Sequence, residues 1–147
     1  MSAPRVAVRA IVVAGGRVLL VNAFPGEVSD LWVPPGGGVE AGTSLHDNLV
    51  REVREETGLV IRPGRLAGLS EFHNPATGFH QVELLFRARL TGGAEPVLAD
   101  PEGVVNRLCW ASEAELDDLR VKPGILRDAA FGRGRRLLHE ALDLMVG

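Results

Sequence analysis

The chain has 147 residues, of which 46% are hydrophobic and 24% are charged, and its formal net charge is −3 at pH 7. This size and composition fit one globular domain, which we expect to span residues 1–147. The acidic balance argues against a nucleic-acid partner, which needs a dense basic surface. The apolar stretches are too short to span a bilayer and no signal-peptide pattern opens the chain, so we expect no membrane partner and a cytoplasmic location.

The first part of the chain is predicted to alternate strands with glycine-rich turns. Residues 6–13 and 17–22 are predicted strands, and the glycine pair between them predicts a hairpin. Residues 24–38 hold three prolines and four glycines, which predicts irregular structure with one short extended piece at 31–33. Thr43 or Ser44 can cap a helix that runs to about Thr57, and Gly58 is placed to end it.

The second part is predicted to contain further strands and two helices. Strands are expected over 66–72, 80–90 and 104–111, with a loop at 74–78 and a short acidic helix near 112–119. Leu138, Ala141, Leu142 and Met145 are spaced as one face of an amphipathic C-terminal helix. The alternating rhythm of a parallel βαβ sheet is absent, so the predicted fold class is α+β, with a mixed sheet flanked by helices.

The predicted helix over residues 44–57 carries a cluster of glutamates. Glu52, Glu55 and Glu56 are spaced i, i+3 and i+4, so their carboxylates share one helical face. Glu52 and Glu56 fall at the edge of the apolar stripe, where a buried acid needs a compensating partner such as a bound metal. The alternative interpretation is a solvated surface on which Arg51 and Glu55 form an exposed ion pair worth roughly a few tenths of a kcal/mol.

The segment from residue 37 to residue 59 resembles the Nudix box, G-x5-E-x7-R-E-U-x-E-E-x-G-U, where U is aliphatic. Gly37 fills the first glycine, and the second half is complete in Arg51, Glu52, Val53, Glu55, Glu56, Gly58 and Leu59. Every spacing matches, and the single departure is Thr43, which stands where the pattern has its first glutamate. By this resemblance the chain is identified as a member of the Nudix hydrolase family. The expected fold is then the Nudix fold, a mixed β-sheet sandwiched between α-helices.

The resemblance also implies an activity and a set of site residues. Nudix hydrolases cleave a nucleoside diphosphate linked to another moiety by water attack at phosphorus, with Mg²⁺ or Mn²⁺. The implied metal ligands are Glu52, Glu55 and Glu56, together with the backbone carbonyl of Gly36. Arg51 is expected to orient the glutamates, and Glu52 is the candidate general base. The expected substrate is a small nucleotide, either a nucleoside triphosphate or an ADP-ribose-like compound.

Residues outside the box are expected to select the substrate. Pro75 lies sixteen residues beyond Leu59, close to the position of a proline in ADP-ribose-cleaving members. Phe24 and Phe79 are candidates for stacking on a base, and His80 is a candidate for contacting phosphate or ribose, although loop histidines without a role are just as common.

Two further questions stay open at this stage. Glu83 and Glu102 are candidates for an additional acid of the site, and each could equally be a plain surface acid. Thr43 supports one alternative function, a non-catalytic Nudix-fold module that binds nucleotide as a sensor. A homodimer is common in the family, but no decisive interface stripe is visible.

Overall fold

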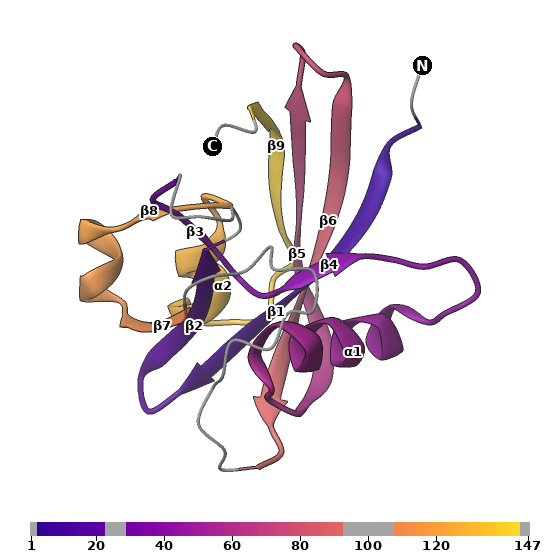
Figure 1. Ribbon diagram of the computed structural model, residues 1–147. Helices are drawn as coiled ribbons and strands as arrows, with labels where there is room; N and C mark the ends of the chain where they lie inside the picture. Colours follow the sequence, from indigo (N-terminus) through magenta and orange to yellow (C-terminus); the bar gives the residue numbers. More distant parts are fainter. Residues whose placement is uncertain (1–2, 23–28, 93–107, 145–147) are drawn as a thin grey trace.

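The computed structural model describes residues 3–22, 29–92 and 108–144. Its sheet is strongly curled, and strand β1 (Arg5–Ala14) lies near its centre (Figure 1). β1 turns back into β2 (Arg17–Asn22) through Gly15 and Gly16, which both have positive φ, and the two strands pair antiparallel. The predicted glycine hairpin is therefore confirmed.

The sheet is mixed in direction. Its strands follow the order β8-β3-β2-β1-β6-β5-β9, with β4 paired to β1 and β7 paired to β2. β1 runs parallel to β6 (Phe79–Leu90) and β5 (Ile61–Asn74) runs parallel to β9 (Leu138–Leu144), whereas β5 and β6 form an antiparallel hairpin. The remaining strands are short: β3 (Leu31–Val33), β4 (Gly36–Gly38), β7 (Leu108–Ser112) and β8 (Arg120–Val121).

Helices cover both faces of the sheet, as side-chain alternation along β1 shows. Val8, Ala10 and Val12 belong to the apolar cluster that packs against α1 (Leu45–Thr57). Ile11, on the opposite face, belongs to the cluster that packs against α2 (Leu126–Phe131). The predicted α+β class is confirmed. Among the described residues no helix is long and apolar enough to cross a membrane.

Several predicted elements differ in their bounds or type. β5 and β6 extend further than predicted, so that only a tight turn over residues 75–78 separates them. Residues 104–107 of the predicted strand lie outside the described residues, and β7 begins at Leu108. The short acidic helix is a 3₁₀ helix, η2 (Ala114–Asp118). Gly36–Gly38, expected to be irregular, form the strand β4, which pairs with Ala7–Arg9 of β1.

The predicted C-terminal helix is wrong, because residues 138–144 form strand β9 (Figure 1). β9 pairs with the edge of β5 from Gly68 to His73 and satisfies backbone groups that would otherwise remain open. Its polar residues reach partners outside the segment: Glu140 accepts from the Gly124 amide (2.8 Å) and Asp143 pairs with Lys122 (2.9 Å). Leu142 is 47% exposed, so the apolar spacing does not form a buried helical face.

Candidate active site

The glutamate-bearing helix α1 is fixed at both ends by its own residues. Ser44 is the N-cap, and its hydroxyl accepts a hydrogen bond from the Asp47 amide at 3.1 Å. Gly58 ends the helix in the left-handed conformation (φ 76°), and its amide donates to the Arg54 carbonyl. The predicted helix is confirmed, with Ser44 rather than Thr43 as its cap.

The orientation of α1 places its acids at the border of the core. Leu49 and Val53 are fully buried in the cluster beneath the helix, while Arg54 faces solvent. Glu56 is only 5% exposed, and its Oε1 accepts a hydrogen bond from the Gly36 amide at 3.3 Å. Glu56 therefore points toward β4 rather than into solvent, and its burial agrees with its predicted place at the edge of the apolar stripe.

Strand β4 lies so close to its neighbours that a side chain on Gly36 would meet the backbone of β1, and one on Gly37 would displace the Glu52 carboxylate of α1. A Cβ atom on Gly37 would lie 2.5 Å from Oε2 of Glu52. Gly36 has a φ of 155°, and a Cβ atom there would meet the backbone carbonyl of Val8. The absence of side chains on β4 thus leaves space for the carboxylate of Glu52 beside the strand.

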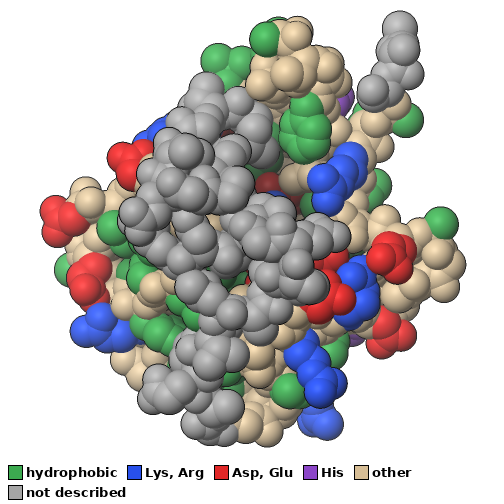
Figure 2. Space-filling view, in the orientation of Figure 1, with side chains coloured by type: hydrophobic (Ala, Val, Ile, Leu, Met, Phe, Trp, Pro, Cys, Tyr) green, Lys and Arg blue, Asp and Glu red, His purple; other side chains and the backbone are tan. Residues whose placement is uncertain are grey.

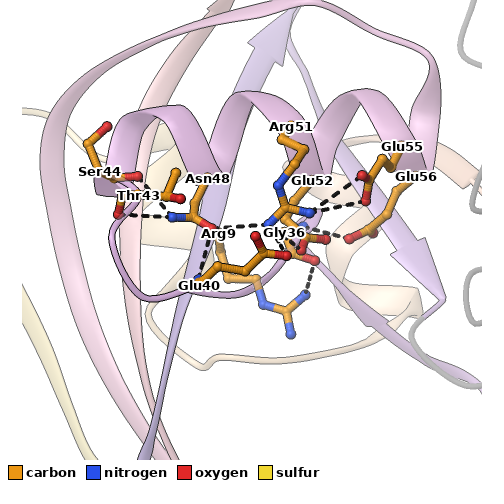
Figure 3. A network of polar contacts seen from close by, with 10 residues as sticks. All are labelled: Arg9, Gly36, Glu40, Thr43, Ser44, Asn48, Arg51, Glu52, Glu55 and Glu56. Carbon is orange, nitrogen blue, oxygen red and sulfur yellow. Dashed lines mark hydrogen bonds and ion pairs between the residues drawn. The ribbon is translucent and has the colours of Figure 1, made fainter.

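Arg51 connects the acidic side chains of the site (Figure 3). Its guanidinium lies 3.3 Å from Glu52, 3.4 Å from Glu55 and 3.5 Å from Glu40. It also donates to Oδ1 of the buried Asn48 at 3.0 Å, and Asn48 in turn donates to the carbonyl oxygens of residues 43 and 44. One guanidinium therefore holds the helix start, the preceding turn and two box glutamates together.

A second arginine enters the site from β1. Arg9 donates through Nε to Glu83 of β6 at 2.9 Å, and the side chains of Arg9 and Glu83 are 14% and 4% exposed. Nη1 of Arg9 lies 3.3 Å from the Pro34 carbonyl and 3.4 Å from the Gly36 carbonyl. Although burial lowers the pKa of Arg9, the charges of Glu83 and Glu56 raise it above its usual value, so this side chain is a permanent cation beside the acids.

The electrostatics of Glu52 differ from those of a surface acid. Burial raises the pKa of the Glu52 carboxyl above its usual value; the charge of Arg51 partly offsets this effect and the charge of Glu55 adds to it. Acidic and basic side chains emerge side by side at the level of β4 and α1 in the space-filling view (Figure 2). The site thus combines crowded carboxylates with two neighbouring cations.

The donor set fits a hard divalent cation by its chemistry. The carboxylates of Glu52, Glu55 and Glu56 and the carbonyl of Gly36 offer only oxygen ligands, which Mg²⁺ prefers. Among the described residues no three His, Cys, Asp or Glu side chains already converge as a metal centre. Arg51 holds Glu52 and Glu55 instead, while Glu56 faces the Gly36 amide. A cation would therefore compete with Arg51 for the same oxygen atoms.

Of the other candidate residues only Glu83 lies within this cluster, among those that the structure describes. Glu83 lies within the site through its contact with Arg9. Phe79 precedes Glu83 by four residues on β6, which places it about 13 Å further along the strand. Pro75, Phe79 and His80 thus belong to the tip of the β5–β6 hairpin, away from α1 (Figure 1). Phe24 and Glu102 are outside the described residues.

Comparison with known proteins places the chain in a family. A family model described as the NUDIX domain matches residues 3–130. The chain is 49% identical over 109 residues to the Nudix hydrolase YvcI of Bacillus subtilis, and this alignment covers 74% of the chain and 68% of YvcI. It is 29% identical over 125 residues to an ADP-ribose pyrophosphatase of Methanocaldococcus jannaschii, and this alignment covers 85% of the chain and 68% of that protein. The chain spans only 43% of the length of a further relative from Bacillus subtilis.

Solved structures agree with the sequence match. A NUDIX hydrolase from Nitrosomonas europaea superposes with a TM-score of 0.75 at 24% identity, over 92% of this chain and 93% of that one. The curled mixed sheet with helices on both faces is therefore the Nudix fold. The chain belongs to the Nudix hydrolase family.

Arg9, Glu40 and Asn48 belong to the polar network of the site but were not among the predicted residues. Arg9 carries a signal in the sequence, because it is the one charged residue inside the apolar run 6–14. A charge within a predicted buried strand calls for a partner. Glu40 and Asn48 carry no comparable signal, since a turn acid and a polar helix residue are ordinary at a surface.

Proposed function

We propose that the chain is an Mg²⁺-dependent Nudix hydrolase, with Mn²⁺ as an alternative cofactor, that cleaves the pyrophosphate linkage of a nucleoside diphosphate linked to another moiety. The proposal rests chiefly on one observation: Arg51 pairs with both Glu52 and Glu55, while the buried Glu56 accepts a hydrogen bond from the Gly36 amide of β4. The substrate is a small nucleotide, either a nucleoside triphosphate or an ADP-ribose-like compound. The named activity of the Methanocaldococcus relative supports the second class.

In this proposal Glu52, Glu55, Glu56 and the Gly36 carbonyl hold the metal. When bound, Mg²⁺ neutralises charge on the phosphates and lowers the pKa of a bound water. Glu52 accepts the proton of the attacking water.

Arg51 acts in the proposal as a positioning residue. Its guanidinium reaches Glu52, Glu55 and Asn48 at 3.0–3.4 Å, so it can hold both carboxylates in a fixed relation to the helix start. A planar guanidinium can serve several acceptors at once, whereas the point charge of lysine cannot reproduce that geometry. We therefore assign Arg51 to the orientation of the acids and not to contact with substrate.

The proposal is tested by assaying nucleoside triphosphates, oxidised nucleoside triphosphates and ADP-ribose with Mg²⁺, with monophosphate or pyrophosphate release as the readout. We expect turnover of at least one compound, and a fall in kcat of about a hundredfold or more for Glu52→Gln and Glu56→Gln. Glu113→Gln, which removes an exposed acid outside the site, is the matched control and should leave kcat unchanged.

A nucleotide sensor is the competing function, and the same panel separates it from an enzyme. Binding of a nucleotide without turnover, in the wild type as in Glu56→Gln, would reject the hydrolase proposal in favour of the sensor. For any compound that is turned over, hydrolysis in ¹⁸O-labelled water identifies the phosphorus that is attacked.

A further inference from the structure

A pocket of about 270 Å³ lies on the side of the sheet opposite the glutamate helix. It is bounded by the end of α2, the segment 132–136 and strand β5. Ala67 and Leu138 contribute to its lining and belong to the apolar cluster beneath α2, whereas α1 packs on the other face of the sheet. The pocket is therefore separate from the Nudix box.

The lining of this pocket is strongly basic. Arg65, Arg133 and Arg136 line it together with a single acid, Asp128, so the charged groups sum to +2. Within residues 3–22, 29–92 and 108–144 no carboxylate forms an ion pair with any of these three arginines. Arg65 makes one weak hydrogen bond, from Nη2 to the Gly134 carbonyl at 3.5 Å. The chain as a whole has a net charge of −3, so this positive charge is a local feature.

The neighbouring helix end does not neutralise the pocket. The carbonyl groups of Ala129 and Ala130 at the end of α2 accept hydrogen bonds from Nη1 of Arg87, at 3.0 and 2.8 Å. The negative end of this helix is thus already satisfied by a fourth arginine. Burial lowers the pKa of Arg87, and the charge of Arg65 lowers it further, because these two arginines lie near each other.

We propose that this pocket binds the phosphate group of a small molecule. A phosphate monoester carries a charge of about −1.5 to −2 near neutral pH, which matches the net charge of the lining. Guanidinium groups bind phosphate oxygens with paired hydrogen bonds, and three arginines line this pocket. The charges line a concavity rather than a long stripe, which favours one phosphate group over an extended polyanion. The proposal does not depend on the activity of the Nudix box.

Calorimetric titration with inorganic phosphate and with methyl phosphate tests the proposal. Both are measured on the full chain in EDTA, against chloride at matched ionic strength, so that metal-dependent binding at the box is absent. We expect saturable binding. Its affinity should fall about tenfold in Arg133→Gln and about tenfold in the separate variant Arg136→Gln. Tighter binding of methyl phosphate would identify an ester as the natural ligand, and tighter binding of phosphate would identify the free ion; either result supports the site.

Two further variants make the test specific. Arg135→Gln removes the same charge from the same segment, but Arg135 does not line the pocket, so its affinity should stay within about twofold of wild type. Asp128→Asn should tighten binding, because it removes the one acid from the lining. All four variants change exposed residues, so the fold should be retained.

Backbone amide shifts locate the bound anion. Shifts on phosphate addition should centre on Gly132 and Gly134, in the pocket, and not on Gly37 at the box. The proposal is overturned if no saturable binding occurs, if Arg135→Gln weakens binding as much as Arg133→Gln, or if the shifts centre on the box.

Discussion

Replacement of Gly37 by alanine tests the role of strand β4 beside helix α1. The new Cβ would lie 2.5 Å from Oε2 and 2.6 Å from Cδ of Glu52, whereas ordinary contacts begin at 3.4 Å. The Glu52 carboxylate must therefore move by about 0.9 Å. Gly37 does not have a positive φ, so alanine causes no backbone strain, and the group that must move is the flexible end of a side chain. The perturbation is local to the site.

The expected result is a loss of activity without a loss of fold. A misplacement of about 1 Å in a catalytic group costs on the order of a hundredfold in rate, or about 2.7 kcal/mol in the activation free energy. The free energy of unfolding should change by less than about 1 kcal/mol, because Glu52 can move aside at little cost. The assays are kcat on the substrate found by the nucleotide panel, and urea unfolding followed by circular dichroism.

A matched glycine provides the control for this experiment. A Cβ atom on Gly92 would meet nothing within 4 Å and Gly92 has no positive φ, so Gly92→Ala should leave both kcat and stability unchanged. If Gly37→Ala keeps more than half of the wild-type kcat, the close approach of β4 to Glu52 does not matter for the reaction. If its kcat falls only in proportion to the fraction unfolded, the effect is structural and the reasoning fails.

Three further predictions concern stability. Glu83→Gln and Arg9→Met should each lower the free energy of unfolding by about 3 kcal/mol, because each leaves a buried charge without its ion-pair partner. The double variant should recover part of this loss in urea unfolding. Additive losses would contradict a coupled pair. Ser44→Ala should cost about 1 kcal/mol through loss of the helix cap, whereas Thr43→Ala should cost much less. Burial raises the folded-state pKa of Glu52, so in EDTA its contribution to stability is present below pH 4.5 and is lost as the pH rises through that raised pKa. Glu52→Gln should therefore become more stable relative to wild type between pH 4 and 7, and a difference independent of pH would contradict the assignment.

The parts of the structure predicted from the sequence are those fixed by neighbours along the chain. The hairpin at Gly15 and Gly16 follows from two adjacent residues that can adopt positive φ. Helix α1 follows from a capping serine, an apolar stripe and a terminating glycine, all within one segment of the chain. The positions of Glu52 and Glu56 at the border of the core follow from the same periodicity. Each of these predictions uses only local spacing.

The parts that were missed depend on pairing between distant segments. The spacing of Leu138, Ala141 and Leu142 fits a helix, yet the segment forms β9 because β5 is long enough to offer an unpaired edge. Likewise, β4 becomes a strand only because β1 lies beside it, with Arg9 opposite Gly36. That register brings the guanidinium of Arg9 to the Gly36 carbonyl and to Glu83, and no local sequence pattern reveals this pairing of strands.

The contacts around Arg51 bear on Thr43, which stands where the Nudix box has its first glutamate. A glutamate at this position would add a carboxylate at the start of α1, whereas the Thr43 side chain adds no charge; the main-chain carbonyl of Thr43 accepts a hydrogen bond from Asn48. Arg51 nevertheless has three carboxylates within 3.5 Å, because Glu40 reaches it from the turn before the helix. The charge balance around Arg51 therefore does not require an acid at position 43. With Thr43 in place of the first glutamate, Glu52 and Glu55 still share Arg51 as their cationic partner.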